Sequence, residues 1–453
     1  MRSENAAVTF VASAVWLFAC ALLSASCGDS SSSASADDAG VEGGTGFGTG
    51  GEGGSGSCVG IGCNKADCGG GPKTSITGQV LDPAGKNPIY NAIVYIPNDP
   101  SAALPSLGNG VSCDKCGATA LNPVVSTLTD ENGKFTLNDV PFQSGVPVVV
   151  QLGKWRRRVS IDVSAKCAEN KLPSPVQLPS KGSDGDMPQI AVTTGGADSL
   201  ECLLLGIGID QSEFVYGPGG NGHIHMYAGA DGFNDNGKIP TAGDNLWQDK
   251  AKMSAYDILA LSCEDQEHPE NKNNRQPMHD YIESGGRVFA THYHYVWFKA
   301  SPQADFQAIA TWGGAYSKDG DYSVDETFPK GKSFAKWLVN TGASTTEGTL
   351  PLTGVTASVA GTSKEAQSWI THDPANVKYF SFNAPISASP ENQCGRVVFG
   401  DLHVSGVSEP SFPGGCTVGN GKALSPQQKA LEFLFWDLSS CVQSDQAAPT
   451  APK

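Results

Sequence analysis

The sequence predicts two folded domains, an all-β sandwich followed by an α/β domain with three layers. The chain has 453 residues, which is too many for one ordinary core. Residues 73–172 contain short β-branched runs separated by turns, as a sandwich does. Across residues 186–442 such runs alternate with helical segments, which is the pattern of a parallel sheet with crossover helices.

Residues 1–27 are predicted to be a lipoprotein signal peptide. The apolar stretch Val8–Leu23 is short for a permanent membrane anchor, and small residues precede Cys27. The segment Leu22–Gly28 resembles a lipobox, whose cysteine becomes a diacylated N-terminus. The usual leucine three residues before the cysteine is Ser24 here, so plain secretion and a retained anchor stay open as alternatives. We expect a bacterial cell-envelope lipoprotein, anchored through Cys27 at the outer membrane or the periplasmic face.

Residues 28–72 are predicted to be a disordered tether. This Gly/Ser-rich stretch has almost no large apolar side chains and cannot offset the entropy lost on ordering. The net charge of the whole chain is −16, which argues against nucleic acid as a partner because phosphate binding needs a basic surface. The expected partners are the membrane, reached through the lipid, and another envelope component.

The 13 cysteines indicate an oxidising compartment. If Cys20 leaves with the signal peptide and Cys27 carries lipid, an odd number remains, so at least one thiol is free when the others pair within the chain. Cys113 and Cys116 form a CxxC motif in a long loop. We expect this motif to form a bridge, with Cys167 as a candidate partner, and not a redox site.

The sandwich is predicted from five strand-like runs and the turns between them. These runs are Ser75–Val80, Ala92–Ile96, Val124–Thr129, Lys134–Leu137 and Val148–Leu152. Three of the segments, Gly78–Val80, Ala92–Val94 and Thr129–Phe135, resemble the carboxypeptidase regulatory-like family, a transthyretin-like sandwich. The resemblance implies a spacer or adhesion module without catalytic residues. Residues 173–185 are predicted to be a linker.

The α/β domain is predicted from buried strands that alternate with helices. The strand-like runs are Pro188–Thr194, Tyr256–Glu264, Arg287–His294 and Gly395–His403, and the closing helix is Ser425–Leu438. An earlier helix is expected over Ser199–Gly206, with Asp198 as its cap and Glu201 as the capping-box partner. Residues 443–453 are predicted to be a disordered tail.

These strands and helices resemble the class I glutamine-amidotransferase-like fold, a flavodoxin-like three-layer arrangement, and within it the trehalose-utilisation (ThuA-like) branch. True amidotransferases carry Gly-x-Cys-x-Gly at the elbow after the third strand. Ala290–His294 occupies that place and contains no cysteine, so glutamine hydrolysis is not expected. The ThuA-like branch is linked with sugar utilisation, which makes a carbohydrate the first expected ligand.

Candidate site residues follow from topology, because ligands of open α/β sheets bind beyond the carboxyl ends of the strands. We expect a ligand-binding role for Thr194, Gly195, Gly196, Cys263 and His294, and a catalytic role for His292, Glu264 and His403. A metal site would use His292, His294 and His403 with a carboxylate from Asp401 or Glu264, and Zn or Fe would be the ion.

A hydrolase is the alternative function of this domain. It would be metal-dependent, or metal-free with a histidine base and either Glu264 as acid or Cys263 as nucleophile. The function that we expect is the binding of a small polar ligand by a degenerate enzyme fold. The aromatic run Tyr293–Phe298 would then offer stacking faces for sugar rings, or else belong to the core.

Overall fold

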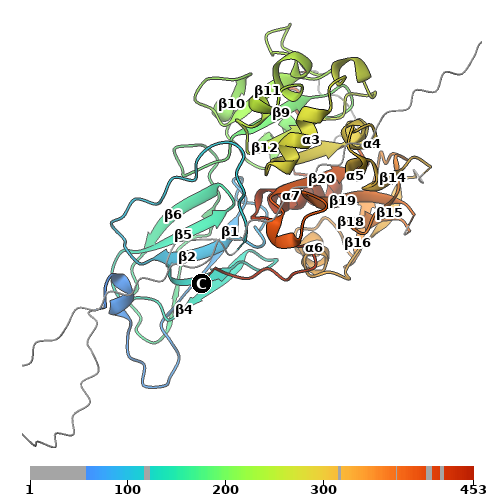
Figure 1. The fold of residues 1–453 in the computed structure, drawn as a ribbon. Helices are drawn as coiled ribbons and strands as arrows, with labels where there is room; N and C mark the ends of the chain where they lie inside the picture. Colours follow the sequence, from blue (N-terminus) through green and yellow to red (C-terminus); the bar gives the residue numbers. More distant parts are fainter. Residues whose placement is uncertain are drawn as a thin grey trace, which may run out of the picture. The chain divides into compact units, whose positions relative to one another are not determined.

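The computed structural model describes residues 58–116, 123–314, 318–373, 375–404, 411–418 and 423–452 (Figure 1). The predicted signal peptide, with Cys27, lies outside the described residues, as does the tether as far as residue 57. The last part of the predicted tether is folded, in contrast to the expectation. It forms the short helix η1 (Ile61–Asn64), and the Cys68–Cys167 disulfide ties it to the sandwich.

The sandwich consists of two four-stranded sheets. One sheet has the order β4-β1-β7 with β8 added to β1, and the other has the order β3-β2-β5-β6. The strands are β1 (Ser75–Leu81), β2 (Ile93–Pro97), β3 (Pro123–Leu128), β4 (Lys134–Asn138), β5 (Val146–Leu152), β6 (Trp155–Ile161), β7 (Glu169–Lys171) and β8 (Val176–Gln177). In β4 the side chains of Phe135 and Leu137 are buried while their neighbours are exposed, which is the alternation of a half-buried strand.

The predicted linker, residues 173–185, is therefore partly a strand. Val176 pairs with Val80 in the parallel register of β8 and β1, and the Val176 side chain is buried. Leu178 is also buried, and its amide donates to the carbonyl of Leu81. These apolar side chains complete the sandwich core, which is why the segment is ordered.

A ten-stranded sheet forms the centre of the second half of the chain. Its order is β10-β11-β9-β12-β13-β20-β19-β18-β15-β16; pairing is parallel from β10 to β20 and antiparallel beyond. The strands are β9 (Ile190–Thr194), β10 (Phe214–Tyr216), β11 (Ile224–Ala228), β12 (Ile258–Leu261), β13 (Arg287–Thr291), β15 (Gly320–Val324), β16 (Thr349–Leu352), β18 (Ala366–Thr371), β19 (Val377–Ala384) and β20 (Gly395–Gly400). A separate pair joins β14 (Ala310–Trp312) and β17 (Val359–Thr362).

Helices cover both faces of this sheet, so the three-layer arrangement is present. In β13, Phe289 packs into one hydrophobic cluster while Val288 and Ala290 pack into another, because successive side chains point to opposite faces. The first cluster includes α1 (Leu200–Gly206), α6 (Pro329–Asn340) and α7 (Pro426–Ser439). The second includes α2 (Lys250–Met253), α3 (Gln276–Glu283), α4 (Val296–Lys299) and α5 (Ala304–Gln307). No helix among the described residues is long and apolar enough to span a bilayer.

The prediction that Asp198 caps the helix over Ser199–Gly206 is wrong in detail. Ser199 takes the cap position of α1 and its side chain makes no capping hydrogen bond. The Asp198 carboxylate instead accepts hydrogen bonds from the backbone amides of Ser199 and Val404. Asp198 thus joins the start of α1 to the segment that follows β20.

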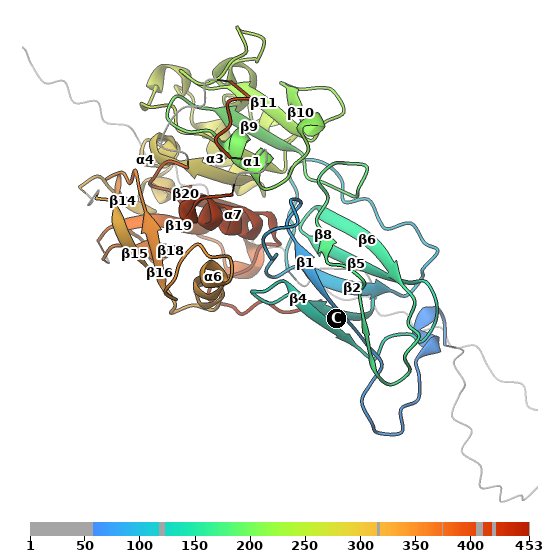
Figure 2. The ribbon, with the colours of Figure 1, turned by 180° about the vertical axis from the view of Figure 1, so that it is seen from behind.

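Helix α7 lies between the sandwich and the ten-stranded sheet (Figure 2). The Trp155 and Trp436 rings meet edge to face at 5.2 Å, and Tyr90 stacks on Phe433 at 5.8 Å. One hydrophobic cluster runs from the sandwich through α7 to the sheet, and residues 57–453 group as one compact unit. The sandwich and the α/β sheet therefore share a core.

Disulfides join the same two parts covalently. Cys113 pairs with Cys394 and Cys116 with Cys441, so each cysteine of the CxxC motif bridges to the α/β part of the chain. The candidate partner Cys167 was wrong, because it pairs with Cys68. Five disulfides are present among the described cysteines, and Cys263 is the free thiol.

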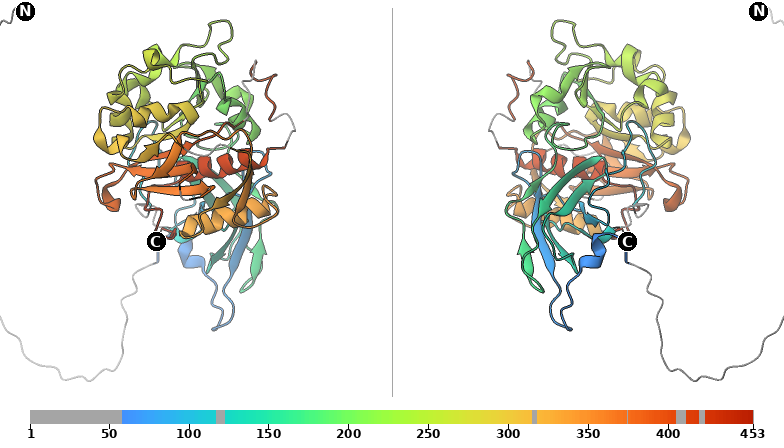
Figure 3. Two further views of the ribbon diagram at one scale, coloured as in Figure 1. Left: turned by 90° about the vertical axis from the view of Figure 1, so that its right-hand side faces the viewer. Right: turned by 90° about the vertical axis from the view of Figure 1, so that its left-hand side faces the viewer.

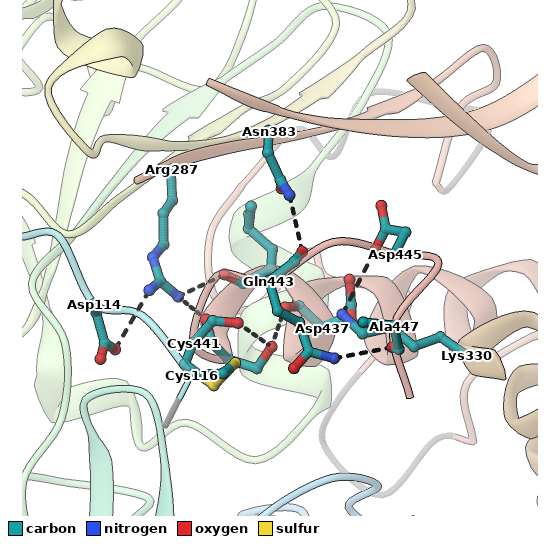
Figure 4. The surroundings of a disulfide bond; sticks show 12 residues. Asp114, Cys116, Arg287, Lys330, Asn383, Asp437, Cys441, Gln443, Asp445 and Ala447 are labelled. Carbon is teal, nitrogen blue, oxygen red and sulfur yellow. Dashed lines mark hydrogen bonds and ion pairs between the residues drawn. A yellow bond between two sulfur atoms is a disulfide. The ribbon is translucent and has the colours of Figure 1, made fainter. Parts of the chain in front are cut away.

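The predicted disordered tail is ordered as far as residue 452, because it supplies a buried counter-charge. The Asp445 carboxylate lies 2.8 Å from the Arg396 guanidinium, which also pairs with Asp437 at 2.6 Å. Figure 4 shows Asp437, Asp445 and Lys330 in the surroundings of the Cys116–Cys441 disulfide. Lys330 pairs with Asp437 at 2.7 Å. The chain then returns to the sandwich (Figure 3), where the Ser126 hydroxyl donates to the carbonyl of Pro452.

A buried carboxyl pair at the junction of the sandwich and α7 predicts a pH-dependent stability. Burial raises the pKa of Glu432 well above its usual value and also raises that of Asp82, and the two side chains share a hydrogen bond. The folded state therefore holds a proton that the unfolded state releases above about pH 4.5, so stability falls as pH rises from there. Glu432→Gln removes the ionisable group while keeping a hydrogen-bonding side chain, and should raise the free energy of unfolding at pH 8 by about 1–3 kcal/mol.

Urea unfolding of the wild type and of Glu432→Gln at pH 5 and pH 8 measures this effect. The wild type should lose more stability between the two values than the variant does. Glu365→Gln, in an exposed turn, serves as the matched control and should follow the wild type. Equal pH slopes for the wild type and Glu432→Gln would contradict a shared proton at this site.

Candidate functional site

The turn after β13 decides which histidines can act together. Strand β13 ends at Thr291, and the 3-10 helix η5 (His292–Tyr295) begins at once and continues into α4. His292 has φ 31°, a left-handed conformation that is costly for a residue with a side chain. Because the strand does not continue, His292 and His294 do not project to one side. The predicted pairing of these two histidines in a metal site is therefore wrong.

His294 has a structural role. Its Nε2 lies 2.8 Å from the carbonyl of Ser262, and its Nδ1 accepts a hydrogen bond from the Trp297 indole at 3.1 Å. Burial lowers the pKa of His294 well below the usual value, so the ring is neutral. Both ring nitrogens are occupied, which leaves none for a metal or a ligand.

Three side chains converge beyond the carboxyl ends of adjacent strands, and we call them the Cys263–His292–His403 cluster. They follow β12, β13 and β20 respectively. Cys263 Sγ lies 3.5 Å from His292 Nδ1, which lies 3.1 Å from His403 Nε2. The three ligand atoms are all within 4.8 Å of one another. Cys263 and His292 are buried and His403 is half-buried, so His403 marks the open side of the cluster.

Burial sets the protonation of the cluster. It raises the pKa of the Cys263 thiol to about 12. It lowers the pKa of His292 to about 4, an effect that His403 strengthens and Asp401 opposes, and it also lowers the pKa of His403. At neutral pH the cluster is a thiol with two neutral imidazoles. A reactive thiolate–imidazolium pair is therefore not favoured, whereas neutral imidazoles are ready to bind a metal.

The Gly-Gly turn after β9 positions Cys263. The amide of Ala197 donates to the carbonyl of Cys263 at 3.0 Å, and a Cβ atom on Gly195 would lie 2.1 Å from that oxygen. Glycine is therefore required by the close approach of the two backbones. Thr194 is buried, and its hydroxyl donates to the carbonyl of Phe233. Thr194 and Gly195 therefore have a supporting role next to the cluster. A Cβ atom on Gly196 would lie 2.9 Å from the Cβ atom of Asp231.

The structure does not bring the two predicted carboxylates into the cluster. Glu264 forms a fully buried ion pair with Lys272, and its other oxygen accepts the amide of Ala230 at 2.7 Å. Asp401 accepts hydrogen bonds from the Thr356 hydroxyl at 2.6 Å and from backbone amides, and it pairs with Lys378. These partners occupy both carboxylates, so neither is available as a metal ligand or as an acid.

Aromatic rings surround His292, and most of the run Tyr293–Phe298 belongs to the core, which was one of its two expected roles. Tyr295, Trp297 and Phe298 are buried there. Tyr293 is half-buried, with its ring 4.0 Å from that of His292. Trp312 on β14, which the sequence analysis did not single out, packs 5.9 Å from Tyr295 and is also half-buried. Trp312 ends a short strand and is followed by two glycines, and this sequence pattern contains no signal of a site.

No family model matches the sequence, and no curated protein matches it. Among solved structures, the chain is similar to a putative GMP synthase component from Thermoplasma acidophilum, with 8% identity and a TM-score of 0.29 over 56% of this chain and 94% of that one. It is also similar to a type II cohesin–X-dockerin complex from Acetivibrio cellulolyticus, with 16% identity and a TM-score of 0.16 over 23% of this chain and 56% of that one. Likenesses this distant carry no functional argument.

Proposed function

We propose that the α/β domain is a metal-dependent hydrolase whose single catalytic ion, Zn²⁺, binds to Cys263, His292 and His403. The convergence of these three ligand atoms within 4.8 Å, from the ends of three adjacent strands, supports this proposal. Three protein ligands with a fourth position left open are the arrangement of catalytic zinc sites. A bound ion would supply Lewis acidity on the open side of the cluster, next to Tyr293.

The donor set differs from the one that the sequence suggested and changes the expected metal. A thiolate and two imidazoles replace the mixed histidine and carboxylate ligands, and among the described residues the cluster contains no carboxylate. Soft sulfur with imidazole nitrogen suits Zn²⁺ better than Fe²⁺. Metal binding displaces the Cys263 proton, so a thiol that is unreactive alone becomes a ligand.

Surrounding residues hold the ligands in place. The carbonyl of His403 accepts a hydrogen bond from the Gln427 side chain at 2.6 Å, and the next residue donates its amide to Asp198. The amide of Cys263 donates to the Thr291 hydroxyl at 3.0 Å. Ligands fixed by such contacts lose little freedom when a metal binds.

We further propose that the protein is a cell-envelope lipoprotein, anchored through Cys27, whose substrate is a small polar molecule such as a carbohydrate. The disulfide bonds support an oxidising location. The half-buried rings of Tyr293 and Trp312 near the cluster support a stacking ligand. In this proposal the sandwich is carboxypeptidase regulatory-like and the α/β domain ThuA-like.

Replacement of one ligand provides the test. The full chain, exported to the periplasm of a bacterial host, should bind Co²⁺ with an intense thiolate-to-cobalt absorption, and Cys263→Ser should abolish that band. His292→Ala should weaken Zn²⁺ binding by more than about 100-fold, because it removes a direct ligand. His372→Ala changes an exposed histidine and should leave binding unchanged. A wild-type chain without the thiolate band, or a band that survives Cys263→Ser, would rule out this centre.

A further inference from the structure

A second group of metal-ligating side chains lies where α3 meets α5 in the helical layer. His279 and Glu283 are four residues apart on α3 and lie one turn above the other on the same face. His279 Nε2 is 3.9 Å from Glu283 Oε1 and 3.8 Å from Asp305 Oδ1 on α5. The ligand atoms of these three residues all lie within 4.8 Å of one another.

Two of these atoms lack the partners that buried polar atoms require. His279 Nε2 and Glu283 Oε1 are both inaccessible to solvent, and neither has a hydrogen-bond partner among the described residues. Their separation of 3.9 Å is too long for a hydrogen bond. An unsatisfied buried group of this kind costs about 1–3 kcal/mol and calls for an explanation.

The His279 ring is nevertheless held in place from other directions. Its Nδ1 lies 3.3 Å from the Asp280 carboxylate, and its plane packs on Phe306 with centroids 4.5 Å apart. A histidine whose one nitrogen contacts a carboxylate directs the other nitrogen outward, as metal-binding histidines do. The side chains of Glu283 and Asp305 are 24% and 37% exposed, so an ion can reach the group from solvent.

We propose that His279, Glu283 and Asp305 bind a divalent transition-metal cation, with Zn²⁺ as the representative ion and water completing its shell. One imidazole and two carboxylates suit zinc, and a cation between them would satisfy both orphaned atoms at once. Direct contact between His279 and the two carboxylates is the simpler account. It does not explain why His279 Nε2 lies beyond hydrogen-bond range of both Glu283 and Asp305.

This cation would link two elements that lead to the Cys263–His292–His403 cluster. Helix α3 continues through Gly285–Gly286 into β13, which ends just before His292. Helix α5 continues into β14, which carries Trp312. The ion would thus fix the helical layer on that face of the sheet, and it does not depend on the proposed catalytic metal.

The test uses the full chain with Cys263→Ser and His403→Ala, which lacks the first centre. After chelation and dialysis, calorimetric titration with Zn²⁺ should show one equivalent bound, and the melting temperature should rise with Zn²⁺ concentration. Adding Glu283→Gln, which keeps the shape but removes the charge, should weaken binding at least about 10-fold. His372→Ala, an exposed histidine beside Asp373, is the matched control and should change nothing.

Results in the otherwise unchanged chain keep the proposal testable if the double variant fails to fold. Wild-type protein should bind two equivalents of Zn²⁺, and Glu283→Gln should bind one while retaining the thiolate-to-cobalt band. Zn²⁺ uptake that is insensitive to Glu283→Gln, or a His279 imidazole signal that Zn²⁺ does not shift, would overturn the proposal. Absence of the thiolate band alone would count against the catalytic centre and leave this site intact.

Discussion

Replacing Arg396 by methionine is expected to lower the free energy of unfolding by about 3–5 kcal/mol. Arg396 is 1% exposed and pairs with two carboxylates, Asp437 and Asp445. Burial alone would raise the pKa of Asp437, but Arg396 and Lys330 hold it below the usual value, so Asp437 is ionised in the folded protein. Methionine fills a similar volume but leaves an excess of buried negative charge.

A double variant separates charge from packing. In Arg396→Met with Asp445→Asn, the remaining pair is Lys330 with Asp437 at 2.7 Å, which is balanced. The double variant should therefore be more stable than Arg396→Met alone, and guanidinium unfolding of both measures the difference. If the double variant is no more stable than Arg396→Met, the loss of stability comes from packing and not from the unpaired charge.

Replacing both Cys113 and Cys116 by serine is expected to cost more stability than the two single replacements added together. With one bridge still closed, the other closes only a loop of about 50 residues, so each single loss should cost about 4 kcal/mol. Removing the second bridge then opens a loop of more than about 100 residues, which costs more. The double variant should exceed the sum by about 1 kcal/mol.

Denaturant unfolding without reductant, with free thiols blocked, measures the three variants. Cys58→Ser with Cys63→Ser is the control, because that bridge spans a sequence separation of 5 and should contribute about 2 kcal/mol. Strictly additive losses at Cys113 and Cys116 would mean that the two bridges do not act on one loop.

Much of the fold could be predicted from local patterns. Alternation in Lys134–Asn138 and the uninterrupted apolar runs of Ile190–Thr194 and Ile258–Leu261 report directly which faces of a strand are buried. The ordered tail could not be predicted this way. Asp445 is ordered by Arg396, a partner far away in the sequence, and local composition contains no trace of that pairing.

The candidate site could also be predicted only in part, because local patterns do not show contacts between residues that are distant in the sequence. Topology places residues after β12, β13 and β20 at one edge, and this reasoning brought Cys263, His292 and His403 onto the list of candidates. His294 does not join the cluster because the left-handed φ at His292 ends the strand. Asp401 does not join it because its carboxylate is paired with Lys378 on β19.

The bridges between Cys113, Cys116 and the far end of the chain have a consequence for the order of biosynthesis. A chain is synthesised from its N-terminus, and N-terminal regions fold first. The two thiols of the CxxC motif must then stay apart until Cys394, the partner of Cys113 at a sequence separation of 281, has been synthesised. The nearest wrong partner of each is the other, so correct maturation requires a thiol–disulfide isomerase, or a sandwich loop that keeps the pair from closing on itself.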